Sequence, residues 1–141
     1  MRFRVGFACA LALAGTVASA QERLALSRAV YVENFGSGGS MRTVEAASRL
    51  KRGDRVILMI EWTGAEARKG TVVRSAIPRA LAFQRGSSDA LEVSVDGGRK
   101  WGRIGDLRIG DRLASPEEVT HVRLRVHGKT AGRMTYSAIV R

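Results

Sequence analysis

Apolar and polar residues alternate along several short segments of this chain, which is the pattern of β-strands with one buried face. Residues 91–95, 119–126 and 132–141 all alternate in this way. Residues 54–63 instead contain a run of five apolar residues, Val56 to Ile60, which predicts a strand covered on both faces. No long segment has helical periodicity, so the pattern predicts an all-β protein.

The last two predicted strands, 119–126 and 132–141, are separated only by the short segment HGKTAG. A connection of this length predicts that they pair as an antiparallel hairpin. The side chains predicted to face the core are Val122, Leu124, Val126, Met134, Tyr136, Ala138 and Val140. Those predicted to line the outer face are His121, Arg123 and Arg125, with Arg133 and Arg141 beside them.

Glycine-containing breaks divide the chain at seven places, and the short segments between them are typical of a β-sandwich or β-barrel. Residues 43–52 fit either a short capped helix or a strand leading into a turn, and we favour the strand. Residues 115–118 (SPEE) predict a single capped turn, with Ser115 as the cap and Pro116 at the first helical position.

The first 20 residues have the layout of a secretory signal peptide. Arg2 and Arg4 precede an apolar run, and Ala18-Ser19-Ala20 forms a small-x-small cleavage signature before Gln21. The apolar run is too short to span a bilayer, and we expect no transmembrane segment in the mature chain. We therefore expect a signal peptide at 1–20, one domain at 21–141 and a periplasmic or secreted location.

The only cysteine, Cys9, lies within this apolar run, so the mature chain would have no disulfide and would depend on its core for stability. Removing Arg2 and Arg4 from the 24 basic residues leaves 22 against 13 acidic residues, a net charge of +9. This charge favours polyanionic partners. For an exported protein, envelope polysaccharide, lipopolysaccharide or an acidic envelope protein is a more plausible partner than nucleic acid.

Residues 94–102 (SVDGGRKWG) have the spacing S-x-D-x-G-x-x-W at Ser94, Asp96, Gly98 and Trp101. This resembles the Asp-box, a hairpin motif repeated around the propellers of sialidases. A propeller needs at least four blades of about 40 residues, and this chain carries one copy of the motif. We therefore interpret the four residues as a structural turn, in which Trp101 packs over the hairpin.

A second resemblance covers residues 50 to about 126. Leu50, Gly53 and Asp54 resemble the turn that precedes a strand in the bacterial conserved repeat domain of unknown function, which occurs in exported and cell-surface proteins. Thr63-Gly64 matches the end of that strand, although Trp62 replaces the usual asparagine. A later family element is matched by Ile77, Pro78, Leu81 and Phe83. The resemblance implies an immunoglobulin-like β-sandwich, which agrees with the expected 7–9 antiparallel strands.

The chain has no recognisable catalytic arrangement. Three acidic residues, Glu22, Asp54 and Asp111, directly precede an arginine and are typical of solvated charges near turns. Glu61, near the end of the most apolar strand, is the one candidate for a perturbed acid, and the alternative that we favour is a residue at the mouth of the strand. We expect an exported structural or protein-interaction module of the bacterial envelope, with no enzymatic activity, metal or cofactor. The alternative is a binder of anionic envelope polysaccharide or lipopolysaccharide through a basic strand face, and the remote alternative is a small glycan-active enzyme. The candidate anion-binding residues are His121, Arg123, Arg125 and Arg133. The alternative is that these charges only protect an exposed strand from pairing with other chains.

Overall fold

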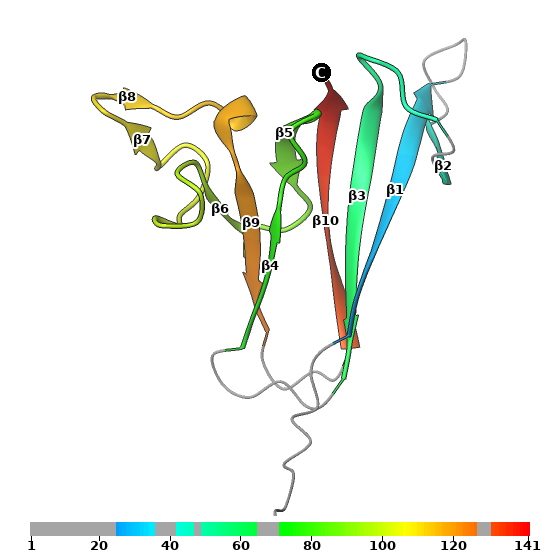
Figure 1. Ribbon diagram of the computed structural model, residues 1–141, viewed down its shortest axis with the longest axis horizontal. Coiled ribbons are helices and arrows are strands. Elements are labelled where there is room, and N and C mark those ends of the chain that lie inside the picture. The colour runs from blue at the N-terminus through cyan, green and yellow to red at the C-terminus, as the bar shows by residue number, and fades with distance from the viewer. Residues whose placement is uncertain (1–24, 36–41, 47–48, 65–70, 127–130) are drawn as a thin grey trace, which may run out of the picture.

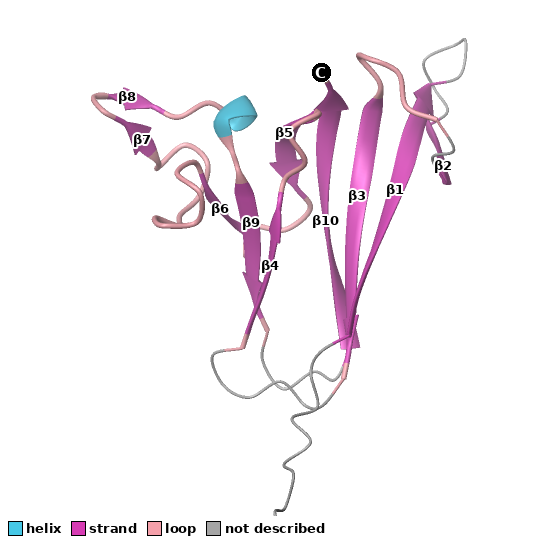
Figure 2. Cartoon of the chain, viewed as in Figure 1, coloured by secondary structure: helices cyan, strands magenta, loops and turns pink. Residues whose placement is uncertain are grey.

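The computed structural model describes residues 25–35, 42–46, 49–64, 71–126 and 131–141, and the expected signal peptide at 1–20 lies outside these residues. The described chain is all-β, as the alternation predicted, with one short 3₁₀ turn (Figure 2). The strands are β1 (Ala25–Phe35), β2 (Arg42–Ala46), β3 (Arg55–Thr63), β4 (Val72–Ala76), β5 (Leu81–Gly86), β6 (Glu92–Ser94), β7 (Arg108–Ile109), β8 (Arg112–Leu113), β9 (His121–Arg125) and β10 (Ala131–Val140); the turn is η1 (Pro116–Glu118).

These strands form three antiparallel sheets (Figure 1). The largest has five strands in the order β2-β1-β3-β10-β5, and a second has three strands in the order β4-β9-β6. The two-residue strands β7 and β8 form a separate small hairpin. The ten described strands exceed the 7–9 expected, because β7 and β8 arise in a glycine-containing stretch that the sequence suggested was only a break.

Strand β3 is at the centre of the large sheet and provides the middle of the core. Its even-numbered residues, Val56, Leu58, Ile60 and Trp62, are all buried. The prediction that this strand is covered on both faces is wrong: Ile57 and Met59 on its other face are only half-buried. The second sheet packs on the side of the large sheet that carries the even-numbered residues of β3.

Both larger sheets contribute to one hydrophobic core. Val73 of β4, Val93 of β6 and Val122 of β9 belong to the same buried cluster as the even-numbered residues of β3. Tyr136 of β10 lies in this cluster with its ring centroid 5.8 Å from that of Phe83. Burial removes the Tyr136 hydroxyl from water and so raises its pKa to about 12.

The predicted hairpin between the last two strands is not formed. Strand β9 pairs with β4 and β6 in the small sheet, whereas β10 pairs with β3 and β5 in the large one. Both edges of β10 are already occupied, by β3 in a nine-residue register and by β5 on the other side. Strands β9 and β10 therefore belong to different sheets, although they are close in the sequence.

Two predicted turns are present and set strand boundaries. Before β3, the backbone N–H of Lys51 donates to Oδ2 of Asp54 at 2.7 Å, and Gly53 adopts a positive φ of 90°. At residues 115–118, the Ser115 N–H donates to Oε2 of Glu118 at 2.9 Å, and Pro116 begins the 3₁₀ turn. In the 43–52 stretch, β2 ends at Ala46 and the Lys51 turn follows, which confirms the strand interpretation for the described residues.

A candidate anion-binding face

The outer face of the β4-β9-β6 sheet carries a row of basic residues. Register places Arg74 of β4, Arg123 of β9 and Glu92 of β6 side by side across the sheet. Arg125 lies two residues further along β9, about 7 Å away for an extended strand. The basic face comprises Arg74, Trp101, His121, Arg123 and Arg125.

Arg123 is held between an acid and an aromatic ring. Its Nε donates to Oε2 of Glu92 at 2.8 Å, and its guanidinium carbon lies 4.6 Å from the ring centroid of Trp101. The hydrogen bond from Arg123 lowers the pKa of Glu92, and the charges of Arg123 and Arg125 act in the same direction. Glu92 therefore stays ionised, and Arg123 is a fixed part of the face instead of a free cation.

The two flanking arginines are more accessible. The Arg125 side chain is 53% exposed, against 18% for Arg123, and its Nε lies 3.6 Å from the same Glu92 oxygen. Arg74 is exposed on β4 and pairs with no carboxylate among the described residues. Arg74 and Arg125 are therefore the cations best placed to reach a ligand, on either side of the immobilised Arg123.

The Asp-box-like stretch forms a closed turn organised by Asp96. Its Oδ1 accepts hydrogen bonds from the Ser94 hydroxyl at 2.8 Å and from the backbone N–H groups of Arg99 and Lys100 at 3.0 and 2.9 Å. The bond from Lys100 is the main cause of the lowered pKa of Asp96, followed by the bond from Ser94. This carboxylate is committed to the loop backbone, as in other Asx-type turns.

The same turn places Trp101 on the basic face. Gly98 has a φ of 91° and contacts the indole, whose Nε1–H donates to the Gly98 carbonyl at 2.8 Å. Two backbone hydrogen bonds between Val93 and Gly102 close the hairpin. The indole then lies against Arg123 and, edge to face, against His121, with ring centroids 6.4 Å apart. The turn therefore contributes to the basic face by fixing the orientation of the Trp101 indole.

Three sequence predictions about this region need correction. Arg133 does not join the basic face, because β10 belongs to the other sheet and Arg133 lies there opposite Glu61. Ser94, which alternation predicted to point outward with Glu92, is fully buried because the turn folds back over it. Arg141, at the end of β10, also lies apart from the basic face: its guanidinium donates to the carbonyls of Leu81 and Glu117.

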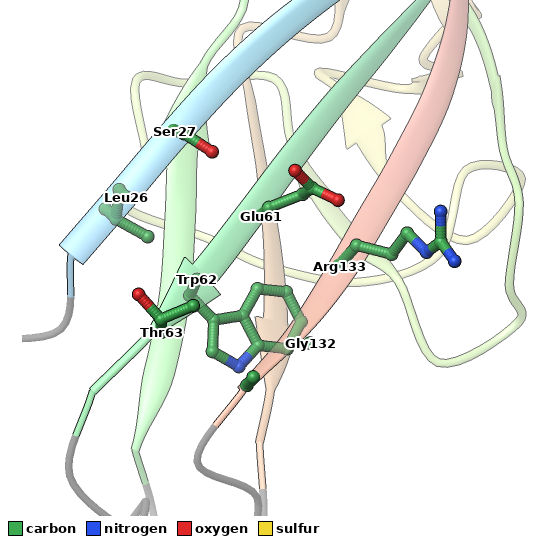
Figure 3. A pocket seen from close by; sticks show the side chains of 8 residues that line it. Leu26, Ser27, Glu61, Trp62, Thr63, Gly132 and Arg133 are labelled. Carbon is green, nitrogen blue, oxygen red and sulfur yellow. The ribbon is translucent and has the colours of Figure 1, made fainter.

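A second feature is a hollow of about 450 Å³ at the end of β1, β3 and β10 (Figure 3). Glu61, Arg133 and Ser27 line it, together with Trp62 and Gly132, which lie nearer the strand ends. Glu61 is exposed at this strand end. Within the described chain, no group of three or more His, Cys, Asp and Glu side chains could hold a metal ion.

Comparisons of the chain with models of known protein families, with characterised proteins and with solved structures found no match. No helix among the described residues is long and apolar enough to cross a membrane.

The sequence interpretation missed Arg74 and the stacking of Trp101 on Arg123. Neither was visible in the sequence, because both depend on the register between strands far apart in the chain.

Proposed function

We propose that this protein is an exported, non-enzymatic, immunoglobulin-like β-sandwich module of the bacterial envelope that binds an anionic polysaccharide or lipopolysaccharide through its basic face. Export rests on the signal-peptide pattern at 1–20 and the cysteine-free chain that follows it. The immunoglobulin-like assignment is supported by two antiparallel sheets that share a core, and by the conserved-repeat resemblance.

The arrangement of Arg74, Arg123 and Arg125 carries the proposal. An exposed arginine normally loses side-chain entropy when it binds, which weakens its contribution. Here the central Arg123 is already immobilised by Glu92 and Trp101, and its neighbours are spaced across and along the sheet. Guanidinium groups at strand spacing suit sulfate, phosphate or carboxylate groups along a polymer.

A non-enzymatic role is supported by the distribution of carboxylates. Of the acidic side chains whose burial is described, only Glu33 is buried, so these acids form no buried carboxylate pair of the kind that glycoside hydrolysis uses. Asp96 is engaged by its own loop.

The test is retention on a heparin column and binding to lipopolysaccharide micelles across a salt series. We expect Arg74→Glu with Arg125→Glu to elute at much lower salt, and the slope of log affinity against log salt to fall by about 1.5–2. The matched control is Arg49→Glu with Arg52→Glu, which changes the net charge equally at exposed positions preceding β3. Equal losses in both variants would mean that net charge alone causes retention, and would contradict the proposal.

A further inference from the structure

Arg74 and Arg123 lie directly opposite each other on the outer face of the small sheet, in the kind of pair whose side chains approach most closely. The register between β4 and β9 pairs them. At one end of this ladder the Val126 N–H donates to the Thr71 carbonyl at 3.0 Å, so the hydrogen-bonded pairs fall on the odd-numbered residues of β4. The two arginines therefore form a non-hydrogen-bonded pair, with Cβ atoms about 4.5–5.5 Å apart.

The charges around this pair do not cancel. Oε2 of Glu92 accepts from Nε of Arg123 at 2.8 Å and lies 3.6 Å from Nε of Arg125, so one carboxylate is shared by two guanidinium groups. Arg74 pairs with no carboxylate among the described residues. Three positive charges and one negative charge leave a net charge of +2 on these four side chains. Like charges directly opposite each other in a sheet are destabilising, so this group favours an anion.

Arg123 keeps donors for that anion although its position is fixed. Its hydrogen bond to Glu92 uses Nε, and no hydrogen bond within the described chain engages its two terminal nitrogens. The Trp101 ring, with its centroid 4.6 Å from the guanidinium carbon, holds the group in place. The terminal N–H groups are therefore pre-organised for a ligand, with the exposed Arg74 and Arg125 beside them.

The net charge and the number of free donors favour one class of anionic group. A phosphomonoester carries about −1.5 to −2 at pH 7 and has three strong acceptor oxygens. It therefore matches both the net charge of the group and the several guanidinium donors that converge on it. A sulfate ester or a carboxylate carries a single negative charge and would leave part of the repulsion between the arginines uncompensated.

We propose that the basic face binds a phosphomonoester group between Arg74 and Arg123, with Arg125 as the third cation. This inference rests on the proposed function, because it names the anionic group that the same face recognises on its polymer. The phosphate oxygens accept hydrogen bonds from the terminal nitrogens of Arg123 and from Arg74. Binding removes the repulsion that the two arginines exert on each other in the free protein.

This repulsion predicts that Arg74→Gln is more stable than the wild type when no ligand is present. We expect its Tm to rise by about 1–5 °C in phosphate-free buffer of low ionic strength. The matched control is Arg85→Gln, which removes one charge from an exposed arginine of another edge strand, β5, where the residue opposite is the neutral Ser137. An equal change of Tm in both variants would overturn the proposal, because the two arginines would then not repel each other.

Ligand class is tested by NMR titration of the mature chain with glucose 6-phosphate, glucose 6-sulfate and inorganic phosphate. The wild type should bind the phosphate ester at least ~5-fold more tightly than the sulfate ester, because of its additional charge. Arg74→Gln should weaken the binding of glucose 6-phosphate at least ~10-fold, whereas Arg85→Gln should bind it like the wild type. Inorganic phosphate that binds more tightly than the ester would overturn the assignment to an esterified group.

Lipopolysaccharide micelles extend the test to a polymer, and binding should fall at least ~5-fold once a phosphatase has removed the phosphomonoesters. Equal affinities for glucose 6-phosphate and glucose 6-sulfate would overturn the phosphate assignment but leave polyanion binding intact. The opposite result is equally distinct. If Arg74→Glu with Arg125→Glu lost no more heparin retention than Arg49→Glu with Arg52→Glu, while glucose 6-phosphate still bound through Arg74, only the proposed polymer binding would be contradicted.

Discussion

Gly132 and Trp62 are neighbours across β10 and β3, and the indole lies over the glycine backbone. A Cβ atom built at Gly132 would be 2.3 Å from Cζ2 of Trp62, far inside van der Waals contact. The ring is nearly fully buried, so it has little room to move away. Gly132 is therefore required by packing and not by backbone conformation.

We expect Gly132→Ala to lower the free energy of unfolding by about 1–3 kcal/mol, because the added methyl group overpacks the site. In a strand without such a contact, replacing glycine by alanine generally stabilises the fold by about 0.5–1 kcal/mol. A destabilising effect of Gly132→Ala would therefore indicate the steric contact with Trp62. Urea denaturation gives the free energy. In a Trp62→Leu background the penalty should disappear, whereas an equal penalty in both backgrounds would show that the indole is not its cause.

At the scale of elements, the Glu118 side chain of η1 bonds to the β7-β8 hairpin, which precedes η1 in the chain, while β9 follows it. The two terminal guanidinium nitrogens of Arg112 in β8 donate to Glu118, at 2.8 and 2.5 Å, and the Ser115 N–H donates to the same carboxylate. Chiefly because of the bond from Arg112, the pKa of Glu118 falls from 4.5 to about 2. The position of the small hairpin relative to β9 thus depends on an ionised Glu118.

This pKa shift predicts how stability depends on pH. Between pH 4.5 and about 2, Glu118 is protonated in the unfolded chain but ionised in the folded one, so acidification favours unfolding. The contribution of Glu118 is complete above pH 4.5 and is lost as pH falls towards 2. Thermal melts over this range should show a shallower decline for Glu118→Gln than for wild type. The control is Glu117→Gln, exposed on the same turn, which should follow the wild-type curve.

At the scale of the whole molecule, the proposed export and the proposed polyanion binding concern the same part of the chain, the residues that follow the expected signal peptide. Without residues 1–20 the chain keeps a net charge of +9, and it must fold without disulfides. The buried cluster that the two sheets share supplies that stability.

We expect the protein produced with its full sequence in a bacterial host to be recovered from the periplasm with Gln21 as its first residue, because Ala18-Ser19-Ala20 suits signal peptidase. Intact mass spectrometry measures this directly. An Ala18→Lys with Ala20→Lys variant should retain the leader. Recovery of the wild type only as an uncleaved cytoplasmic chain would contradict the export proposal.

Local pattern was sufficient to place most strands and turns. Alternation located β6, β9 and β10, and Asp and Gly at the right offsets marked the Asp96 turn, because side-chain direction and turn chemistry are properties of a few consecutive residues. Thus the all-β class, the inward residues of β9 and the closed turn around Ser94, Asp96, Gly98 and Trp101 could be read from short segments.

Pairing between distant strands was decided by the tertiary structure. Whether β9 lies beside β10 or β4 depends on how the strands assemble into two sheets over one core, which is not a local property. That choice removed Arg133 from the basic face, added Arg74 and brought Trp101 and Glu92 to Arg123. Along β9 and β10 the sequence alone determined which residues point in and out, because the strand repeat is two residues; Ser94, over which the turn folds back, is the exception in β6. The fold determined which outward residues meet, because that depends on register across the whole sheet.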